Sequence, residues 1–279
     1  MDWRDIRAGL VEVTRAAFEP ISRAEAKWHA RIDVADEDVL VDAYIAAARR
    51  QLVKDTGHVP VNETFDWTID AFPSDRRSLT LPRWPVASVS SVTSYDENDA
   101  ATTFSSGDYR VDTALGRLIL NDDASWPSGL RRHSGGVIRF VAGGNGTAVS
   151  VSSLTSSGTA PSITATATTS SAHGFSTGDR RTIVGAAQDA YNGTFVIAVT
   201  GATTFTYTVV SGTPATPATG TITVRDLAVP ETHRLAMLLL ITQWYEHRSP
   251  VADVSGERFE MPMAYEALIG GADRVYAVA

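Results

Sequence analysis

Residues 20–57 most constrain the fold, because they contain two helices whose starts and stops are both visible in the sequence. Ser22 is followed three positions later by Glu25, which is the spacing of a capping box. In such a box each side chain accepts a hydrogen bond from a free backbone N–H group of the first turn. This pattern predicts a helix over residues 22–31.

The second helix carries its charges where the helix dipole favours them. It begins among the acidic residues Asp36, Glu37 and Asp38, and it ends near Lys54, ahead of Gly57. Between these ends, apolar residues recur at helical spacing and form one stripe: Val41, Ile45, Ala48 and Leu52. We therefore expect the two helices to pack against a further apolar surface.

A third helix is predicted at Pro230–Arg248, with proline in the first turn and Ser249-Pro250 as the stop. Residues 235–241 are apolar on every side, which is typical of a core helix that other helices cover. The alternative is a membrane span. The apolar run is much shorter than the roughly 20 residues a bilayer requires, so a core helix is favoured and no membrane partner is expected.

Composition limits the classes of function. The chain has 279 residues and no cysteine, which excludes disulfides and cysteine nucleophiles. Its formal charge of −8 argues against tight wrapping of duplex DNA, because such binding depends on Lys and Arg neutralising phosphates. The first ten residues lack the apolar core of a signal peptide, so we expect synthesis in a cytoplasm.

The composition changes abruptly within residues 147–224, which are rich in Thr, Ser, Gly and Ala and carry four charges that cancel. A disordered linker is one interpretation. The β-branched and aromatic runs favour a small all-β module, either a sandwich or a barrel. Its predicted strands are residues 163–168, 181–184, 194–199, 204–209 and 221–224, with a hairpin turn at 200–203.

Glycines mark the start of this module, at Gly143, Gly144 and Gly146, and Arg225 marks its end. A glycine-rich loop can bind phosphate, but that requires a helix directly after it, and here a strand-like segment follows. We therefore interpret these four residues as an insertion hinge. The expected domains are a discontinuous host, residues 1–146 and 225–279, and an inserted module, residues 147–224.

The host also contains short strands of alternating polarity. Apolar side chains predicted to face its core are Phe65, Trp67, Ile69, Val86, Val89, Val92, Leu118, Leu120, Ile138 and Phe140. The predicted fold class is therefore α+β, with a helical-bundle host domain that has short β-strands and carries the inserted all-β domain.

Residues with catalytic or metal-binding potential are scattered. The six histidines are His29, His58, His133, His173, His233 and His247, and they show no helical zinc spacing. The acids at 36–38 fit a helix dipole better than a cation site, and residues 96–99 fit a polar turn better than a calcium loop. No nucleophile elbow or phosphate-binding loop occurs. We expect no enzyme activity, no cofactor and no metal, although a distributed active site remains an alternative.

Two aromatic interpretations stay open. Trp28 and Trp244 are expected to anchor helix packing and not to stack on bases. If the module instead bound carbohydrate, exposed aromatic residues such as Phe175 or Tyr191 would have to form a flat platform.

The order and spacing of several segments resemble the head-tail connector (adaptor) proteins of tailed bacteriophages, a family also found in gene transfer agents. The segments are ISRAEAKWHARID, DEDVLVDAYIAAARRQLVKDTG, FDWTIDAFP, LPRWPVASVSSVTSYD, DYRVDT, GRLIL, IRFVAG and VPETHRLAMLLLITQWYEHR. The resemblance covers residues 15–143 and 228–279, and the chain departs from it by the segment 147–224.

This resemblance implies a virion structural protein at the neck, or head-tail interface. It implies a homo-oligomeric ring, commonly of twelve subunits, docked beneath the portal protein and receiving a head-closure (stopper) or tail protein below. Genome DNA would pass through its bore without sequence-specific binding. It also implies that the C-terminal tail contacts the portal, through Asp273, Arg274, Val275, Tyr276, Ala277, Val278 and Ala279. The alternatives are a head-closure or tail-completion protein, and a surface- or carbohydrate-binding protein.

Overall fold

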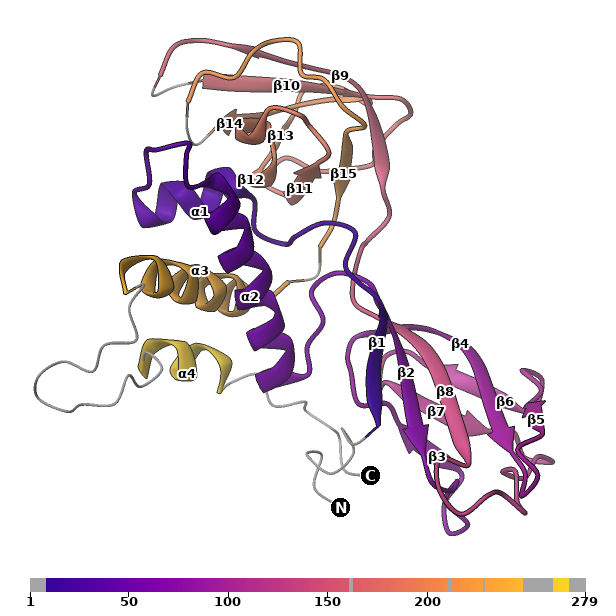
Figure 1. Cartoon of the computed structure of the whole chain (residues 1–279). Coiled ribbons are helices and arrows are strands. Elements are labelled where there is room, and N and C mark those ends of the chain that lie inside the picture. The colour runs from indigo at the N-terminus through magenta and orange to yellow at the C-terminus, as the bar shows by residue number, and fades with distance from the viewer. Residues whose placement is uncertain (1–8, 161–162, 210–211, 228, 248–262, 271–279) are drawn as a thin grey trace, which may run out of the picture. The chain divides into compact units, whose positions relative to one another are not determined.

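The computed structural model describes residues 9–160, 163–209, 212–227, 229–247 and 263–270 (Figure 1). These residues fall into two compact units. The first unit holds residues 9–17 and 57–144, and the second holds residues 18–56 and the described residues from 145 onward.

The first unit consists of two antiparallel sheets. The larger sheet has the order β1-β2-β8-β4-β5 and the smaller has the order β3-β7-β6. The strands of the larger sheet are β1 (Leu10–Thr14), β2 (Glu63–Ile69), β8 (Gly136–Ala142), β4 (Val86–Tyr95) and β5 (Ala101–Thr103). Those of the smaller sheet are β3 (Ser78–Thr80), β7 (Arg117–Leu120) and β6 (Tyr109–Asp112).

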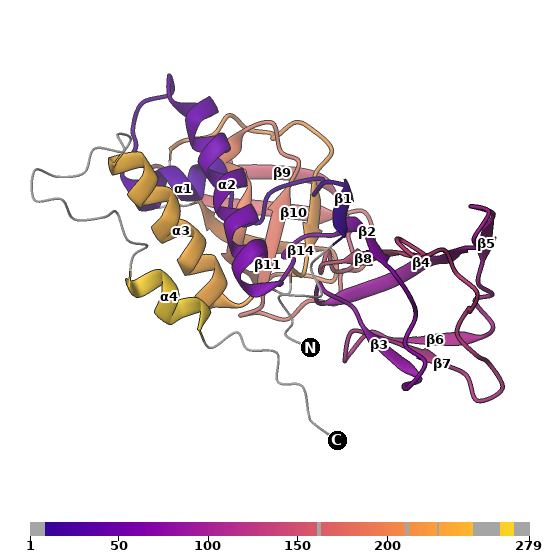
Figure 2. The ribbon, with the colours of Figure 1, turned by 60° about the horizontal axis from the view of Figure 1, so that its bottom comes forward.

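The alternation seen in the sequence sets which face of each strand is buried. On β2, Phe65 and Trp67 are buried while the residues between them are partly exposed. Ile138 and Phe140 of β8 and Leu118 of β7 are fully buried. Because side chains alternate between the faces of a strand, each sheet has one apolar face. Figure 2 shows the two sheets of this unit as separate layers. The strands predicted here are confirmed, and they form a β structure of their own.

The second unit contains the four described α-helices, and the positions of the three helices predicted from the sequence are confirmed. The four helices are α1 (Arg23–Ala30), α2 (Asp38–Thr56), α3 (Glu231–Glu246) and α4 (Met263–Ile269). Ser22 caps α1, because its Oγ accepts a hydrogen bond from the N–H of Glu25 at 3.2 Å. Gly57, which follows α2, has φ +72°, a left-handed conformation that suits a helix stop.

One buried cluster joins the four helices. Ala26 of α1, Val41 and Leu52 of α2, Met237 of α3 and Tyr265 of α4 all belong to it. The predicted apolar stripe of the second helix therefore packs against the core helix, as expected. One residue of the core helix differs, since Leu235 is 43% exposed.

The β module follows in the same unit as a strongly curved sheet of seven strands, in the order β12-β11-β15-β9-β10-β14-β13. The strands are β9 (Val149–Ser157), β10 (Ile163–Thr169), β11 (Arg180–Val184), β12 (Gly193–Val196), β13 (Ala198–Val199), β14 (Thr204–Val209) and β15 (Thr223–Arg225). The two edge strands, β12 and β13, are separated in the chain by Ile197, so the sheet nearly closes into a barrel. β9 was missed by the sequence analysis.

The expected fold class is wrong in its description of the host domain. The host is not a helical bundle with short strands, because the strands of residues 10–142 form two sheets of their own and the described chain as a whole is richer in strand than in helix. The physical reason is that the short strands of residues 10–142 pair with each other and bury their own core. The helices instead pack around one shared core in the unit that also contains the module (Figure 1).

Candidate functional site

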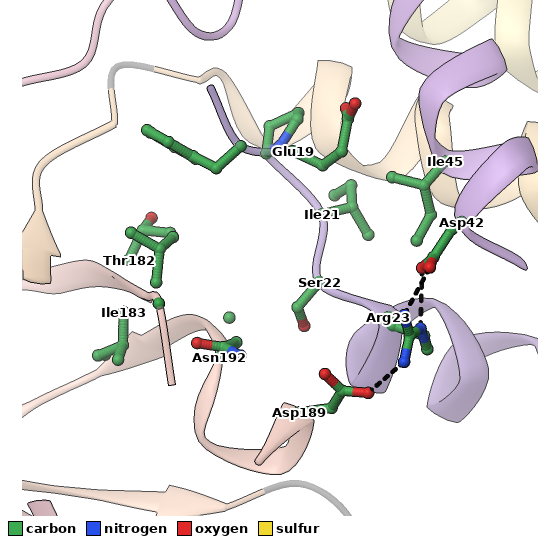
Figure 3. Close-up of a pocket in the computed structure, with 15 residues that line it drawn as sticks. Glu19, Ile21, Ser22, Arg23, Asp42, Ile45, Thr182, Ile183, Asp189 and Asn192 are labelled. Carbon is green, nitrogen blue, oxygen red and sulfur yellow. Dashed lines mark hydrogen bonds and ion pairs between the residues drawn. The ribbon is translucent and has the colours of Figure 1, made fainter. Parts of the chain in front are cut away.

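A pocket of about 230 Å³ lies where the helices meet the β module (Figure 3). The helical side contributes residues 18–23 together with Asp42 and Ile45. The module contributes residues 182–185 together with Asp189, Asn192 and Gly193. We call this junction the seam.

Arg23, the first residue of α1, connects both sides of the seam. Its Nε donates to Asp42 of α2 at 2.8 Å, and its Nη1 donates to Asp189 of the module at 2.6 Å (Figure 3). A weaker contact of 3.4 Å reaches Asp38. The hydrogen bond with Asp42, assisted by the nearby negative charges, raises the pKa of Arg23 above its ordinary value. Arg23 therefore stays charged and links α1, α2 and the module.

Arg234 of α3 makes a second connection between the helices and the module, and its side chain is more deeply buried than that of Arg23. Its guanidinium forms an ion pair with Glu25 of α1 and donates to the hydroxyl of Thr194 on β12 at 2.8 Å. Burial raises the pKa of Glu25 and lowers the pKa of Arg234, although each partner opposes the other's shift. The second oxygen of Glu25, Oε2, is buried without a hydrogen-bond partner among the described residues. Burial thus disfavours both charges, and each partner offsets part of that cost for the other.

The chemistry of the seam is that of a polar joint. Its charged groups pair with one another, and no metal-binding group of three His, Asp or Glu side chains occurs in the described parts of the chain. The buried apolar residues of the helices and those of the module form two separate clusters. The module therefore docks through ion pairs and hydrogen bonds, while each side keeps its own apolar core.

The predicted insertion hinge lies at a close approach of backbone segments. Gly146 has φ +58°, and a Cβ atom there would come within 2.2 Å of the carbonyl oxygen of Asp226. Val149 and Val224 are paired across β9 and β15, so the two ends of the module lie side by side. Gly143 has φ +124° and packs against the backbone of Val61 in the first unit. Arg225 lies over the ring of Phe18, 5.2 Å from its centroid.

Acidic residues singled out from the sequence have structural partners. Asp38 binds Lys27 at 2.6 Å, and Glu37 accepts a hydrogen bond from Tyr245. Asp96 accepts from the N–H groups of Asn98 and Ala100, at 2.8 and 2.9 Å, which makes residues 96–99 the expected polar turn. None of these groups converges on a cation site.

The histidines are distributed over both units. His58, His173 and His233 are buried, and burial lowers the pKa of His233. His29 shares a hydrogen bond of 2.9 Å with Thr242 of α3.

The aromatic platform required by a carbohydrate-binding module is not formed by the two residues proposed for it. Tyr191 is fully buried, and its hydroxyl donates to Ser156 at 2.9 Å. Phe175 stacks on His173 and lies under the guanidinium of Arg181, 4.6 Å from its centroid. Trp244 packs against the helical cluster as expected. The packing role expected for Trp28 is wrong, since 61% of this residue is exposed.

The expected portal contact, Asp273 to Ala279, lies outside the described residues. None of the helices in the described ranges is long and apolar enough to cross a membrane.

The sequence analysis missed Arg23 and Arg234 as the residues that join the module to the helices. A signal for Arg234 exists, because it directly precedes the apolar run of the core helix, and a charge that enters a core needs a partner. Nothing local marks Arg23, whose partners are 15 to 166 residues away in the chain.

The sequence matches no family model and no curated protein. Two solved structures are similar to it over 97% of this chain and 97% of theirs. One is a chain in the neck of an empty gene transfer agent (GTA) particle, computed with C6 symmetry, with 19% identity and a TM-score of 0.50. The other is a chain in the virion of a native GTA particle, with 18% identity and a TM-score of 0.50. At this identity the likeness concerns the fold, so the chain shares its fold with proteins of these particles.

Proposed function

We propose that this chain is a structural protein of a phage-like particle, an adaptor ring in the neck between the portal and the tail. The observation that carries the proposal is the fold likeness, over 97% of both chains, to chains from the neck and the virion of GTA particles. The ordered sequence segments that resemble the adaptor family support it by a separate route.

A ring of identical subunits, twelve by family resemblance, is the proposed assembly. One similar structure was computed with C6 symmetry, and a cyclic ring is the closed form that head-to-tail contacts between copies generate. The portal protein above it, a head-closure or tail protein below it, and residues 273–279 as the portal contact are parts of the same proposal. The location would be the virion neck.

The negative net charge of the chain suits a channel through which the genome passes. A net charge of −8 gives the wall of a channel little means to hold DNA by releasing counterions from its phosphates. The bore would therefore let the duplex slide. The polar seam also fits a structural role, since its arginines form ion pairs with neighbouring carboxylates.

We further propose that residues 147–224 are an insertion in a host formed by residues 1–146 and 225–279. Support comes from the adjacency of its two ends, at Gly146 with Asp226 and at Val149 with Val224. Gly143, Gly144, Gly146 and Arg225 would form the hinge. The separate apolar cores of helices and module are what an inserted domain requires.

Deletion of the gene from a particle-producing strain tests the function. An adaptor ring predicts heads that lack attached tails, with normal particles restored by the wild-type gene. Electron microscopy of purified particles should place the protein at the neck. Particles with tails attached in the absence of the protein, or its location at the tail tip or the capsid lattice, would rule the adaptor role out.

A further inference from the structure

Trp28 is the most exposed tryptophan of the described chain. It is 61% exposed, whereas Trp67, Trp84, Trp126 and Trp244 are buried or half-buried. A large aromatic side chain left in water is unusual for a monomer, and aromatic residues are enriched at the centres of interfaces. The exposure of Trp28 therefore points to a contact surface, and its neighbours on α1 and α3 define that surface.

Two contacts fix how α1 and α3 lie beside each other. Glu25 pairs with Arg234, and His29 shares a hydrogen bond with Thr242. The contacts follow the same order along both helices, so the helices are parallel, and Figures 1 and 2 both show them side by side. At 3.6 residues per turn, Leu235 lies within about 20° of Thr242 around α3, on the flank that adjoins α1.

Helical geometry then brings the exposed apolar residues to one side. Trp28 and Leu235 turn out of the α1–α3 contact in the same direction, because both helices are right-handed and parallel. Leu239, one turn after Leu235, is half-buried on this side. We call Trp28, Leu235 and Leu239 the Trp28 face.

The opposite side of the same helices is the core. Ala26, Val41, Met237 and Ile241 are buried there. The helices thus bury one apolar side in their shared core. The Trp28 face is a second apolar side, and it is exposed to solvent. Aromatic residues are enriched among the anchors of protein interfaces.

We infer that the Trp28 face is covered by the neighbouring copy of this chain in the ring. The inference rests on the proposed function, since a ring built from head-to-tail contacts buries a surface patch of every copy. A second copy is favoured over an unrelated protein because the similar neck structure has cyclic symmetry, so each chain there has symmetry-related neighbours. Trp28 would be the anchor of this contact.

The first test measures the oligomeric state of the purified full-length chain by light scattering and electron microscopy. Trp28→Ala should weaken subunit association by roughly 30-fold or more, as expected for truncation of an interface anchor. Trp28→Arg should abolish the ring. Because Trp28 is exposed, both variants should keep the wild-type unfolding midpoint in urea. The matched control is Phe104→Ala, an aromatic truncation in the first unit, which should leave the ring intact.

The second test uses the absence of cysteine in the sequence. The thiol of a Leu235→Cys variant should react with a maleimide at least tenfold more slowly in the ring than after dissociation in mild denaturant. A Thr164→Cys variant, on an exposed position of β10, should react equally fast in both states.

The possible outcomes distinguish the inference about the Trp28 face from the proposed adaptor role. A ring that forms with Trp28→Arg, or one in which the Leu235→Cys thiol stays reactive, overturns the inference and leaves the adaptor role standing. A wild-type chain that is monomeric in solution and on purified particles overturns both.

Discussion

The carboxylate of Glu25 on α1 and the guanidinium of Arg234 on α3 form an ion pair whose side chains are only 14% and 11% exposed. Arg234 also reaches Thr194 of the module at 2.8 Å. One buried guanidinium therefore holds two helices and the β module together. Each charge is tolerated in this place because the other is present.

Removing one partner of this pair should be strongly destabilising. Arg234→Met leaves Glu25 buried and unpaired, and Glu25→Gln does the same to Arg234, so each variant should lose about 3–5 kcal/mol of unfolding free energy. The double variant Glu25→Leu/Arg234→Met should recover most of that loss, since no charge remains in the contact. Urea unfolding followed by circular dichroism measures all three.

A matched ion pair near water provides the control. Arg139 and Asp66 lie on the first unit's larger sheet, 2.7 Å apart, with solvent on both. Asp66→Asn should change the midpoint little, because water compensates for the lost partner. If the Glu25 and Arg234 single variants were equally mild, the Glu25–Arg234 pair would not be buried as described.

The helices were predictable because their signals are local. The capping residue Ser22, the stop at Gly57 and the stripe from Val41 to Leu52 each depend on a few neighbouring positions. The strands of the module were found for the same reason, except β9. That strand is built largely from Ser and Val, and Leu154 is its one fully buried residue, so its alternation is weak.

The arrangement of the elements was not predictable from such signals. β2 pairs with β1 on one side and with β8 on the other, and β8 begins about 70 residues later in the chain. Alternation shows that a strand exists but does not name its partner. The seam likewise depends on Arg23 and Asp189, which are 166 positions apart. Hence a helical-bundle host was expected where two sheets occur.

Burial of His233 should make stability depend on pH. Its pKa is lowered below the ordinary 6.5, so the folded state resists a proton that the unfolded state accepts. Well above pH 6.5 His233 is neutral in both the folded and the unfolded state, so it does not change the free energy of unfolding there. As the pH falls below 6.5, the unfolded state binds more protons and stability decreases.

The measurement is the urea midpoint of the wild-type chain and of His233→Gln between pH 8 and 5.5. The wild type should lose more stability over this range than the variant, since the variant lacks the titrating group. Glu25 is present in both chains, so its raised pKa contributes equally to both. Parallel pH curves would contradict the assignment.

The cap of α1 should be worth about 0.5–2 kcal/mol. Ser22→Ala removes the oxygen that accepts from the N–H of Glu25 and leaves that group unsatisfied. Ser22→Gly should cost a few tenths of a kcal/mol, because water reaches the N–H group and glycine suits a cap position. Equal losses for the two variants would show that the hydrogen bond is not the cause.

The module should separate from the helices more easily than either part unfolds. Asp189→Asn weakens the link to Arg23, whose side chain is 29% exposed, so the expected loss is about 1 kcal/mol or less. Deleting residues 147–224 should leave the helices folded and the oligomeric state unchanged, because the two apolar clusters are distinct. Hydrogen exchange and light scattering measure these effects. Unfolding of α1, α2 and α3 on deletion would refute the insertion.

Gly146 provides the sharpest test of how the two ends of the module meet. It has φ +58°, and a Cβ there would lie 2.2 Å from the carbonyl oxygen of Asp226. Gly146→Ala should therefore destabilise the chain by the cost of a left-handed alanine, about 1 kcal/mol, plus the cost of moving a backbone segment.

Gly174 separates these two costs. Its φ is +68°, and nothing lies within 4 Å of the position its Cβ would take. Gly174→Ala thus carries the conformational cost alone, and the difference between the two variants in urea reports the crowding at Asp226. A larger loss for Gly146→Ala is expected, together with faster hydrogen exchange at Val149 and Val224, whose strands the displaced backbone would pull apart. Equal losses would mean that the entrance and the exit of the module are not held side by side.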